Sequence, residues 1–127
     1  MYNIDNQSRQ AVYEQIIAQV EKYVLSEILT SGDKMPSVRK LSLELNVNPN
    51  TVQRAYTELE RSGVLVIAPG RGAFVSDSGL TVLRTVRRQE YLRKLDEVLR
   101  ELRVSAVEKE KILAIVEQVY EGGGEND

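Results

Sequence analysis

Apolar residues recur every four positions over residues 10–29, and this period predicts an amphipathic helix with one face toward a core. The turn-forming residues 30–33 are expected to end that helix. Lys34 and Met35 are expected to be extended, because a residue before proline avoids helical backbone angles. The predicted inward stripe consists of Val12, Ile16, Val20, Val24 and Ile28, widened by Tyr13 and Ile17.

Two further helices are predicted over residues 38–45 and 49–62, joined by a tight turn. Ser37 directly precedes the first of them, and its hydroxyl can act as the N-cap of that helix. Asn48 can cap the second helix. Pro49 suits the first position of that helix, because the amide that proline lacks would be unpaired there.

A β-hairpin is predicted next, from two short β-forming runs at residues 64–67 and 73–75 around a glycine- and proline-containing turn. Gly63 is expected to end the preceding helix, since glycine readily adopts the left-handed backbone of a C-terminal cap. This order of elements predicts a mainly α fold with a small β-hairpin wing. Residues 1–77 would form a winged helix-turn-helix domain.

A two-helix region is predicted over residues 78–127, after a linker at residues 76–79. The first of its helices spans residues 80–103. Ser105–Glu108 match a capping box, which predicts that the last helix begins there and runs to about residue 120. The glycine-rich end of the chain is expected to be a disordered tail.

The long helix has two apolar faces that point in different directions, and the first, Val82, Leu83 and Val86, is expected to rest on the winged domain. Two helices alone cannot bury the second face, so we expect a homodimer built on a four-helix arrangement. Packing onto the first helix of the same chain is the alternative. The predicted dimer interface consists of Tyr91, Leu95, Val98, Leu102, Ile112, Ile115, Val116 and Val119.

Composition excludes several classes of chemistry. The 127-residue chain contains neither cysteine nor histidine, which removes disulfides, thiolate metal sites and the commonest general base. No carboxylate is paired with a nucleophile or a phosphate-binding loop, so we expect no enzymatic activity, no metal and no cofactor. No apolar run suits a membrane span or a signal peptide, and a cytoplasmic protein is expected.

Charge is distributed unevenly. The net charge is −2, but residues 34–71 carry six cationic and three acidic side chains, a local charge of +3. The helix over residues 49–62 places Val52, Ala55, Tyr56 and Leu59 on one face. Its opposite face is polar and suits the base edges of a DNA major groove. That polar face consists of Asn50, Arg54, Thr57 and Arg61, with Gln53 at its edge.

A wing tip with Arg71 between Gly70 and Gly72 could bring the backbone close to DNA. Each feature by itself has an ordinary explanation as a cap, a solvated surface or a turn. Their order along one chain predicts DNA binding: a basic helix start, a polar helix face and then a wing with an arginine.

Four motifs make the sequence similar to the GntR-type winged-helix regulators, and in particular to their YtrA-like branch. The resemblance covers roughly residues 9–76. It implies a dimeric repressor that binds a short inverted-repeat operator in double-stranded DNA, often near transporter genes. The motifs are Pro36–Leu41 (PSVRKL), Leu45–Val52 (LNVNPNTV), Tyr56–Gly63 (YTELERSG) and Gly70–Val75 (GRGAFV).

The resemblance also implies which residues contact DNA. Many members of the family have an arginine at the position of Pro49, and Gln53 also replaces a common arginine. Arg54 is then the main candidate for reading guanine. The implied contacts are Ser37, Arg39, Asn50, Thr51, Gln53, Arg54, Gly70, Arg71 and Gly72, to which the helix geometry adds Thr57.

A sequence-specific DNA-binding regulator is therefore the predicted function. The alternative is a winged-helix protein-interaction module without DNA binding, but such a helix would carry apolar or aromatic anchors on its exposed face. No residue pattern identifies an effector, and a small molecule bound within the helical interface is left open.

Overall fold

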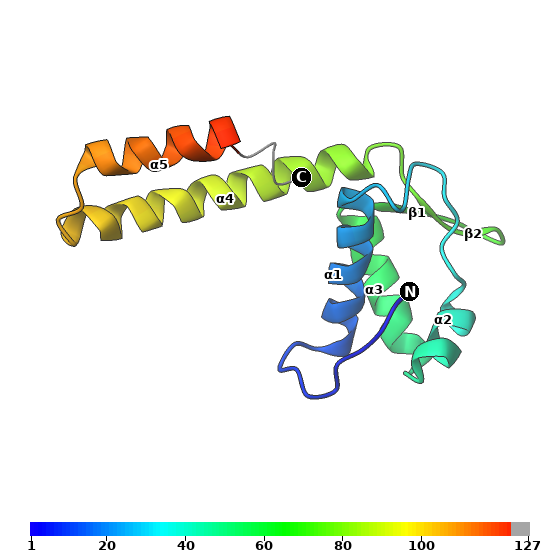
Figure 1. Cartoon of the computed structure of the whole chain (residues 1–127). Coiled ribbons are helices and arrows are strands. Elements are labelled where there is room, and N and C mark those ends of the chain that lie inside the picture. Colours follow the sequence, from blue (N-terminus) through cyan, green and yellow to red (C-terminus); the bar gives the residue numbers. More distant parts are fainter. Residues whose placement is uncertain (123–127) are drawn as a thin grey trace. The chain divides into compact units, whose positions relative to one another are not determined.

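The computed structural model describes residues 1–122 (Figure 1). The chain consists of two compact units, Met1–Arg87 and the residues from Arg88 onward. The predicted boundary between residues 77 and 78 lies in the turn before helix α4, whereas the division into units falls inside that helix. The predicted disordered tail beyond Gly122 lies outside the described residues.

Helix α1 spans Val12–Leu25 and ends four residues before the predicted limit. Glu27 adopts a left-handed backbone with φ of 60°. The amides of Ile28 and Leu29 then donate to the carbonyl of Tyr23 at 2.9 and 3.0 Å, which closes the helix. Ile28 is consequently 60% exposed, and its predicted inward position was wrong.

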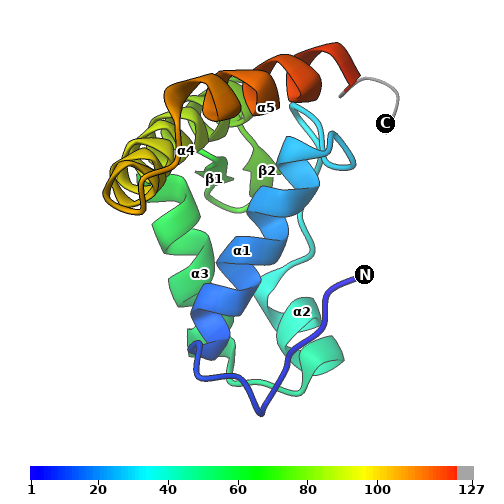
Figure 2. The same ribbon diagram turned by 60° about the vertical axis from the view of Figure 1, so that its left-hand side comes forward.

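Helices α2 (Val38–Leu45) and α3 (Pro49–Arg61) form the predicted pair. The hydroxyl oxygen of Ser37 accepts from the amide of Lys40 at 3.0 Å, and Oδ1 of Asn48 accepts from the amide of Asn50 at 2.8 Å. Both predicted N-caps are thus confirmed. Gly63 follows α3 with φ of 88°, as a C-terminal stop requires. Figures 1 and 2 both show α1 and α3 side by side.

The wing is an antiparallel hairpin of β1 (Leu65–Ala68) and β2 (Gly72–Val75). The segment before α2 pairs with the free edge of β2. The amide of Met35 donates to the carbonyl of Ala73 at 2.8 Å, and the amide of Val75 donates to the carbonyl of Asp33 at 2.9 Å. This pairing confirms the predicted extended backbone of Lys34 and Met35 and ties the base of the wing to the start of α2.

The core of the first unit lies between α1, α2, α3 and the hairpin. Tyr56 is its largest buried side chain, and its hydroxyl donates to the carbonyl of Pro36 at 2.7 Å. Burial raises the pKa of the Tyr56 phenol. The buried hydrophobic residues are Ile16, Val20, Val24, Met35, Leu41, Val52, Ala55, Tyr56, Leu59, Val64, Leu65, Ala73, Val75 and Leu83.

The segment before α1 is held along that helix, an arrangement that the sequence did not indicate. The buried amide of Gln15 donates to the carbonyls of Asp5 and Gln10, both at 3.0 Å. The hydroxyl of Tyr23 donates to the carbonyl of Met1 at 2.6 Å, and its ring meets that of Tyr2 edge-on at 5.5 Å. The hydroxyl of Tyr2 is buried without a hydrogen-bond partner among the described residues.

Helix α4 spans Gly79–Val104 and α5 spans Lys109–Gly122. The predicted start of the last helix at Ser105 was wrong, because that residue belongs to the C-terminal closure of α4. Ala106 is left-handed with φ of 61°, and the amide of Val107 donates to the carbonyl of Leu102 at 3.0 Å. The predicted first apolar face of α4 is divided, since Leu83 is buried and Val86 is 56% exposed.

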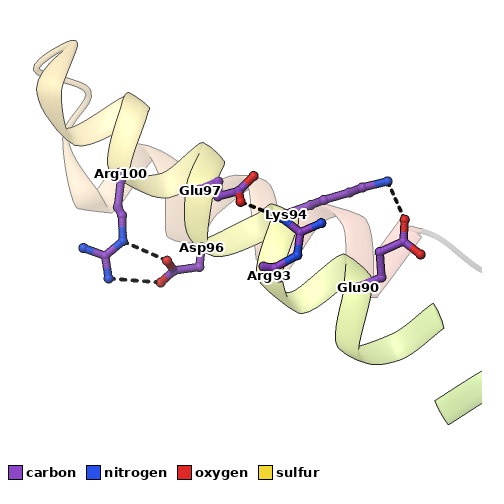
Figure 3. A network of polar contacts seen from close by, with 6 residues as sticks. All are labelled: Glu90, Arg93, Lys94, Asp96, Glu97 and Arg100. Carbon is purple, nitrogen blue, oxygen red and sulfur yellow. Dashed lines mark hydrogen bonds and ion pairs between the residues drawn. The ribbon is translucent and has the colours of Figure 1, made fainter. Parts of the chain in front are cut away.

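The second unit has no buried residue among those described. Three exposed ion pairs follow one another along α4, Glu90–Lys94 at 3.0 Å, Arg93–Glu97 at 2.6 Å and Asp96–Arg100 at 2.8 Å (Figure 3). At about 100° per residue, the pairs Arg93–Glu97 and Asp96–Arg100 lie opposite the predicted interface stripe. Lys94 lies beside the stripe, with its Nζ 4.8 Å from the centre of the Tyr91 ring. No helix in residues 1–122 is long and apolar enough to span a membrane.

Candidate nucleic-acid interface

Helix α3 presents the predicted polar ridge to solvent. Its inward residues Val52, Ala55, Tyr56 and Leu59 are at most 2% exposed, and this burial fixes the orientation of the helix. The ridge on the opposite side consists of the exposed Asn50, Arg54 and Arg61 and the half-buried Thr57, with the exposed Gln53 at its edge. The predicted assignment of the two faces is therefore confirmed.

In the polar first turn of α3, some residues start the helix and others are available for contacts with a ligand. Asn48 uses its side chain as the N-cap and Pro49 fills the first helical position. Asn50 is exposed and its side chain is not the cap, while Thr51 is half-buried. Only Asn50 and Thr51 of this turn remain as candidates for contacts with a ligand.

A groove of about 230 Å³ separates the start of α2 from α3 and the wing. Four of the predicted contact residues line it together: Ser37, Gln53, Gly70 and Gly72. The amide nitrogen of Gln53 donates to the hydroxyl of Thr57 at 3.3 Å, which aligns the two side chains along the ridge. Amide and hydroxyl groups of this kind can hydrogen-bond to base edges.

The other flank of the ridge adjoins α1. The guanidinium carbon of Arg54 lies 3.7 Å from the centre of the Tyr13 ring, a cation–π contact. Arg54, the residue predicted to read guanine, is therefore held against α1. Tyr13 was predicted only as part of the hydrophobic stripe, and no local sequence signal connects it to Arg54.

The wing tip carries Arg71 in an exposed turn, whose amide donates to the carbonyl of Ala68 at 2.9 Å. Gly72 has φ of 117°, and a β-carbon there would lie 3.2 Å from Cε of Lys34. The side chain of Lys34 thus lies against Gly72, next to the wing tip. Sequence reasoning counted Lys34 in the basic segment but did not place it at the wing.

Cationic side chains without a carboxylate partner gather on α2 and the wing. Arg61 pairs with Glu58 at 2.7 Å, so its charge is offset. No ion pair within residues 1–122 involves Lys34, Arg39, Lys40 or Arg71. Residues 1–122 also contain no group of three or more acidic side chains placed to hold a metal. The arrangement suits a polyanion better than a metal ion.

A helical pair followed by a β-hairpin, with a polar second helix beside a basic wing, defines the winged helix-turn-helix class. Residues 12–75 match the family model of the bacterial regulatory proteins of the gntR family. The whole chain is 36% identical to the HTH-type transcriptional repressor YtrA of Bacillus subtilis, with all of both chains covered. The chain belongs to the GntR family, and it is a transcriptional regulator and not an enzyme.

Solved structures agree with this fold. A transcriptional regulator from Oenococcus oeni is 32% identical and superposes with a TM-score of 0.78, over 92% of this chain and 97% of the other. The AraR DNA-binding domain in complex with operator ORE1 is 20% identical, with a TM-score of 0.52 over 57% of this chain and 89% of that one. The latter likeness concerns the fold alone.

Proposed function

We propose that the protein is a dimeric repressor that binds an inverted-repeat operator through α3 and the wing. The exposed polar ridge of α3, set between unpaired cations of α2 and of the wing, is the observation that carries this proposal. In this arrangement α3 enters the major groove, where Asn50 and Gln53 face base edges. The other proposed DNA contacts are Ser37, Arg39, Thr51, Arg54, Thr57, Gly70, Arg71 and Gly72.

Phosphate contacts would come from the surrounding cations. Arg39 at the start of α2 and Arg71 at the wing tip are exposed and unpaired within the described residues. Each phosphate that a cation neutralises releases a counterion from DNA, so these residues would make binding strongly salt-dependent. The glycines beside Arg71 would let the wing backbone approach the sugar–phosphate chain closely.

The second unit supports a homodimer. Tyr91, Leu95 and Val98 of α4 are 51, 49 and 53% exposed, and Ile115 and Val116 of α5 are 51 and 45% exposed. Apolar side chains gathered on one face at such exposure usually mark a surface that another body covers. A second copy with the same stripe would bury it symmetrically in a four-helix arrangement. Leu102, Ile112 and Val119 complete the proposed interface.

Repression is proposed because the relative that is 36% identical over the whole chain is named a transcriptional repressor. The geometry of the interface supports DNA binding, and the proposal of repression over activation rests on that relative. Control of a transporter operon is carried over from the family resemblance alone.

The test is a titration of the protein with two labelled duplexes, one taken from the region upstream of its own gene and one scrambled. Fluorescence anisotropy at about 50 and about 200 mM salt should show preferential binding to the first duplex and a steep loss of affinity with salt. Equal binding to both duplexes, or none to either, would instead favour a protein-interaction module.

Two variants assign the roles within the interface. Gln53→Ala should lower the ratio of specific to scrambled affinity about 10-fold, because a base-reading side chain is lost. Arg71→Gln should weaken both affinities and reduce the magnitude of the salt slope by about 0.9. Gln118→Ala, at an exposed glutamine of α5, is the matched control and should leave all values unchanged.

A further inference from the structure

The contact between Arg54 and Tyr13 changes the role that Arg54 can have on DNA. With its central carbon 3.7 Å from the ring centre, the guanidinium lies on the face of Tyr13. Its N–H donors lie at the edge of the planar group, so stacking leaves them available to a further acceptor. The contact fixes the side chain of Arg54 without consuming its hydrogen bonds.

The charge of Arg54 is also not neutralised by a carboxylate. Glu58 lies one helical turn further along α3, at a spacing that often gives an ion pair. Glu58 instead pairs with Arg61 at 2.7 Å, and the described residues include no ion pair of Arg54. At the surface, the guanidinium of Arg54 therefore contacts an aromatic ring and forms no ion pair within residues 1–122.

Arg54 lies on the flank of the ridge that adjoins α1, whereas Gln53 lines the groove next to the wing. When a recognition helix occupies the major groove, its central ridge faces bases and its flanks face the two sugar–phosphate walls. A guanidinium held against the neighbouring helix would then meet a wall of the groove and not its floor.

We propose that Arg54 binds a phosphate of the DNA backbone and that Tyr13 is the residue that positions it. This proposal rests on the proposed function and assigns base reading to Asn50 and Gln53 alone. Stacking in the free protein would restrict the rotamers of Arg54 before DNA arrives, so less side-chain freedom is lost on binding. The pocket beside Tyr13 is also lined by the carboxylates of Glu14, Glu21 and Glu58. These carboxylates would repel a phosphate, so an attractive contact on this flank has to come from the guanidinium of Arg54.

The test uses the full chain with the specific and scrambled duplexes at two salt concentrations. Arg54→Gln should weaken binding to both duplexes by the same factor, about 5- to 10-fold at the lower salt concentration, and reduce the magnitude of the salt slope by about 0.9. Loss of affinity for the specific duplex alone would overturn the proposal in favour of base reading. Unchanged affinity for both would show that the contact only joins α1 to α3.

Tyr13 is tested by rescue. Tyr13→Leu should weaken both affinities about 3-fold while the charge of Arg54 stays, and Tyr13→Phe, which keeps the ring, should bind like the parent. In the Arg54→Gln background, Tyr13→Leu should have no further effect on DNA affinity. An equal loss in both backgrounds would mean that Tyr13 acts only on the fold, and thermal unfolding of each variant reports that effect separately.

Failure of this inference is distinguishable from failure of the proposed function. If the parent protein does not discriminate between the duplexes, the proposed operator binding fails. The slope change on Arg54→Gln would still decide whether Arg54 contacts phosphate in nonspecific complexes.

Discussion

The two units of the chain differ in how far their apolar side chains are buried. Within residues 1–122, all 14 buried hydrophobic residues belong to Met1–Arg87, whereas Tyr91, Leu95, Ile115 and Val116 of the second unit are each about half exposed. The first unit has helices and a hairpin around one core, so its apolar faces meet one another. The second unit has the end of α4 and α5 only, and two helices leave most of their apolar faces uncovered. The proposed homodimer would cover the apolar faces that the second unit leaves exposed.

The largest expected effect tests the closed core. Leu41 is fully buried in α2, while Leu43 on the same helix is 73% exposed. Leu41→Ala should lower the free energy of unfolding by about 3 kcal/mol through lost burial and a cavity. Leu43→Ala, the matched control, should change it by at most about 0.5 kcal/mol. Urea unfolding followed by circular dichroism measures both, and equal losses would contradict the assignment of the core.

The next prediction concerns the second unit, whose apolar face is exposed. Ile115→Glu should place a charge in the apolar face and convert the dimer to a monomer in sedimentation velocity. Operator affinity should then fall about 100-fold, because two half-sites are no longer bound together. Gln118→Glu adds the same charge on the polar side of α5 and should stay dimeric. A parent protein that sediments as a monomer at micromolar concentration would refute the proposed dimer.

A smaller effect should distinguish polar from apolar burial in the first unit. Burial raises the pKa of Tyr2 to about 12 from 10.0, and its hydroxyl lacks a partner within the described residues. Tyr2→Phe should therefore raise the free energy of unfolding at neutral pH, by up to about 1 kcal/mol. The folded state holds this proton more tightly than the unfolded chain, so stability is kept below pH 10 and falls as pH rises toward 12.

The pH dependence gives that prediction a second measurement. Between pH 9 and about pH 11.5, the midpoint of urea unfolding should fall less in Tyr2→Phe than in the parent protein. Tyr56, whose pKa is also raised by burial, remains in both proteins and accounts for the residual fall. Identical pH profiles would show that the Tyr2 phenol is not buried in solution.

The smallest effect is expected on the charged side of α4. Glu97→Gln removes the 2.6 Å ion pair with Arg93, in which both side chains are 61% exposed. Exposed pairs of this spacing stabilise a helix by about 0.3–0.5 kcal/mol, so unfolding should change by no more than that. The dimer should persist, since this side lies opposite the apolar stripe. Loss of the dimer in Glu97→Gln would contradict an interface on the apolar stripe, because it would place the interface on the charged side of α4.

Local chemistry explains which parts of the fold the sequence could predict. The caps at Ser37 and Asn48 and the stop at Gly63 depend on neighbouring backbone groups, and all three were predictable. The ends of α1 and α4 depend instead on Glu27 and Ala106 in left-handed conformations. Neither residue type signals such a conformation, so the end of α1 and the start of α5 were misplaced, whereas the predicted end of α4 at residue 103 was within one residue of Val104.

The site shows the same division. The period of α3 was enough to predict its exposed ridge and its buried face. The position of Arg54 on Tyr13 and the path of Lys34 over Gly72 join segments far apart in the chain. Such contacts follow from the packing of whole elements, which no local pattern encodes.

The stacked pair also offers an optical handle. The chain contains six tyrosines and no tryptophan, so a single introduced tryptophan would be its only indole. Tyr13→Trp would place that indole beneath the guanidinium of Arg54, and tryptophan is the aromatic side chain that binds cations best. The fluorescence of this tryptophan would then change if added unlabelled DNA moves the guanidinium of Arg54. Because the chain has no other tryptophan, the change could be assigned to this one contact.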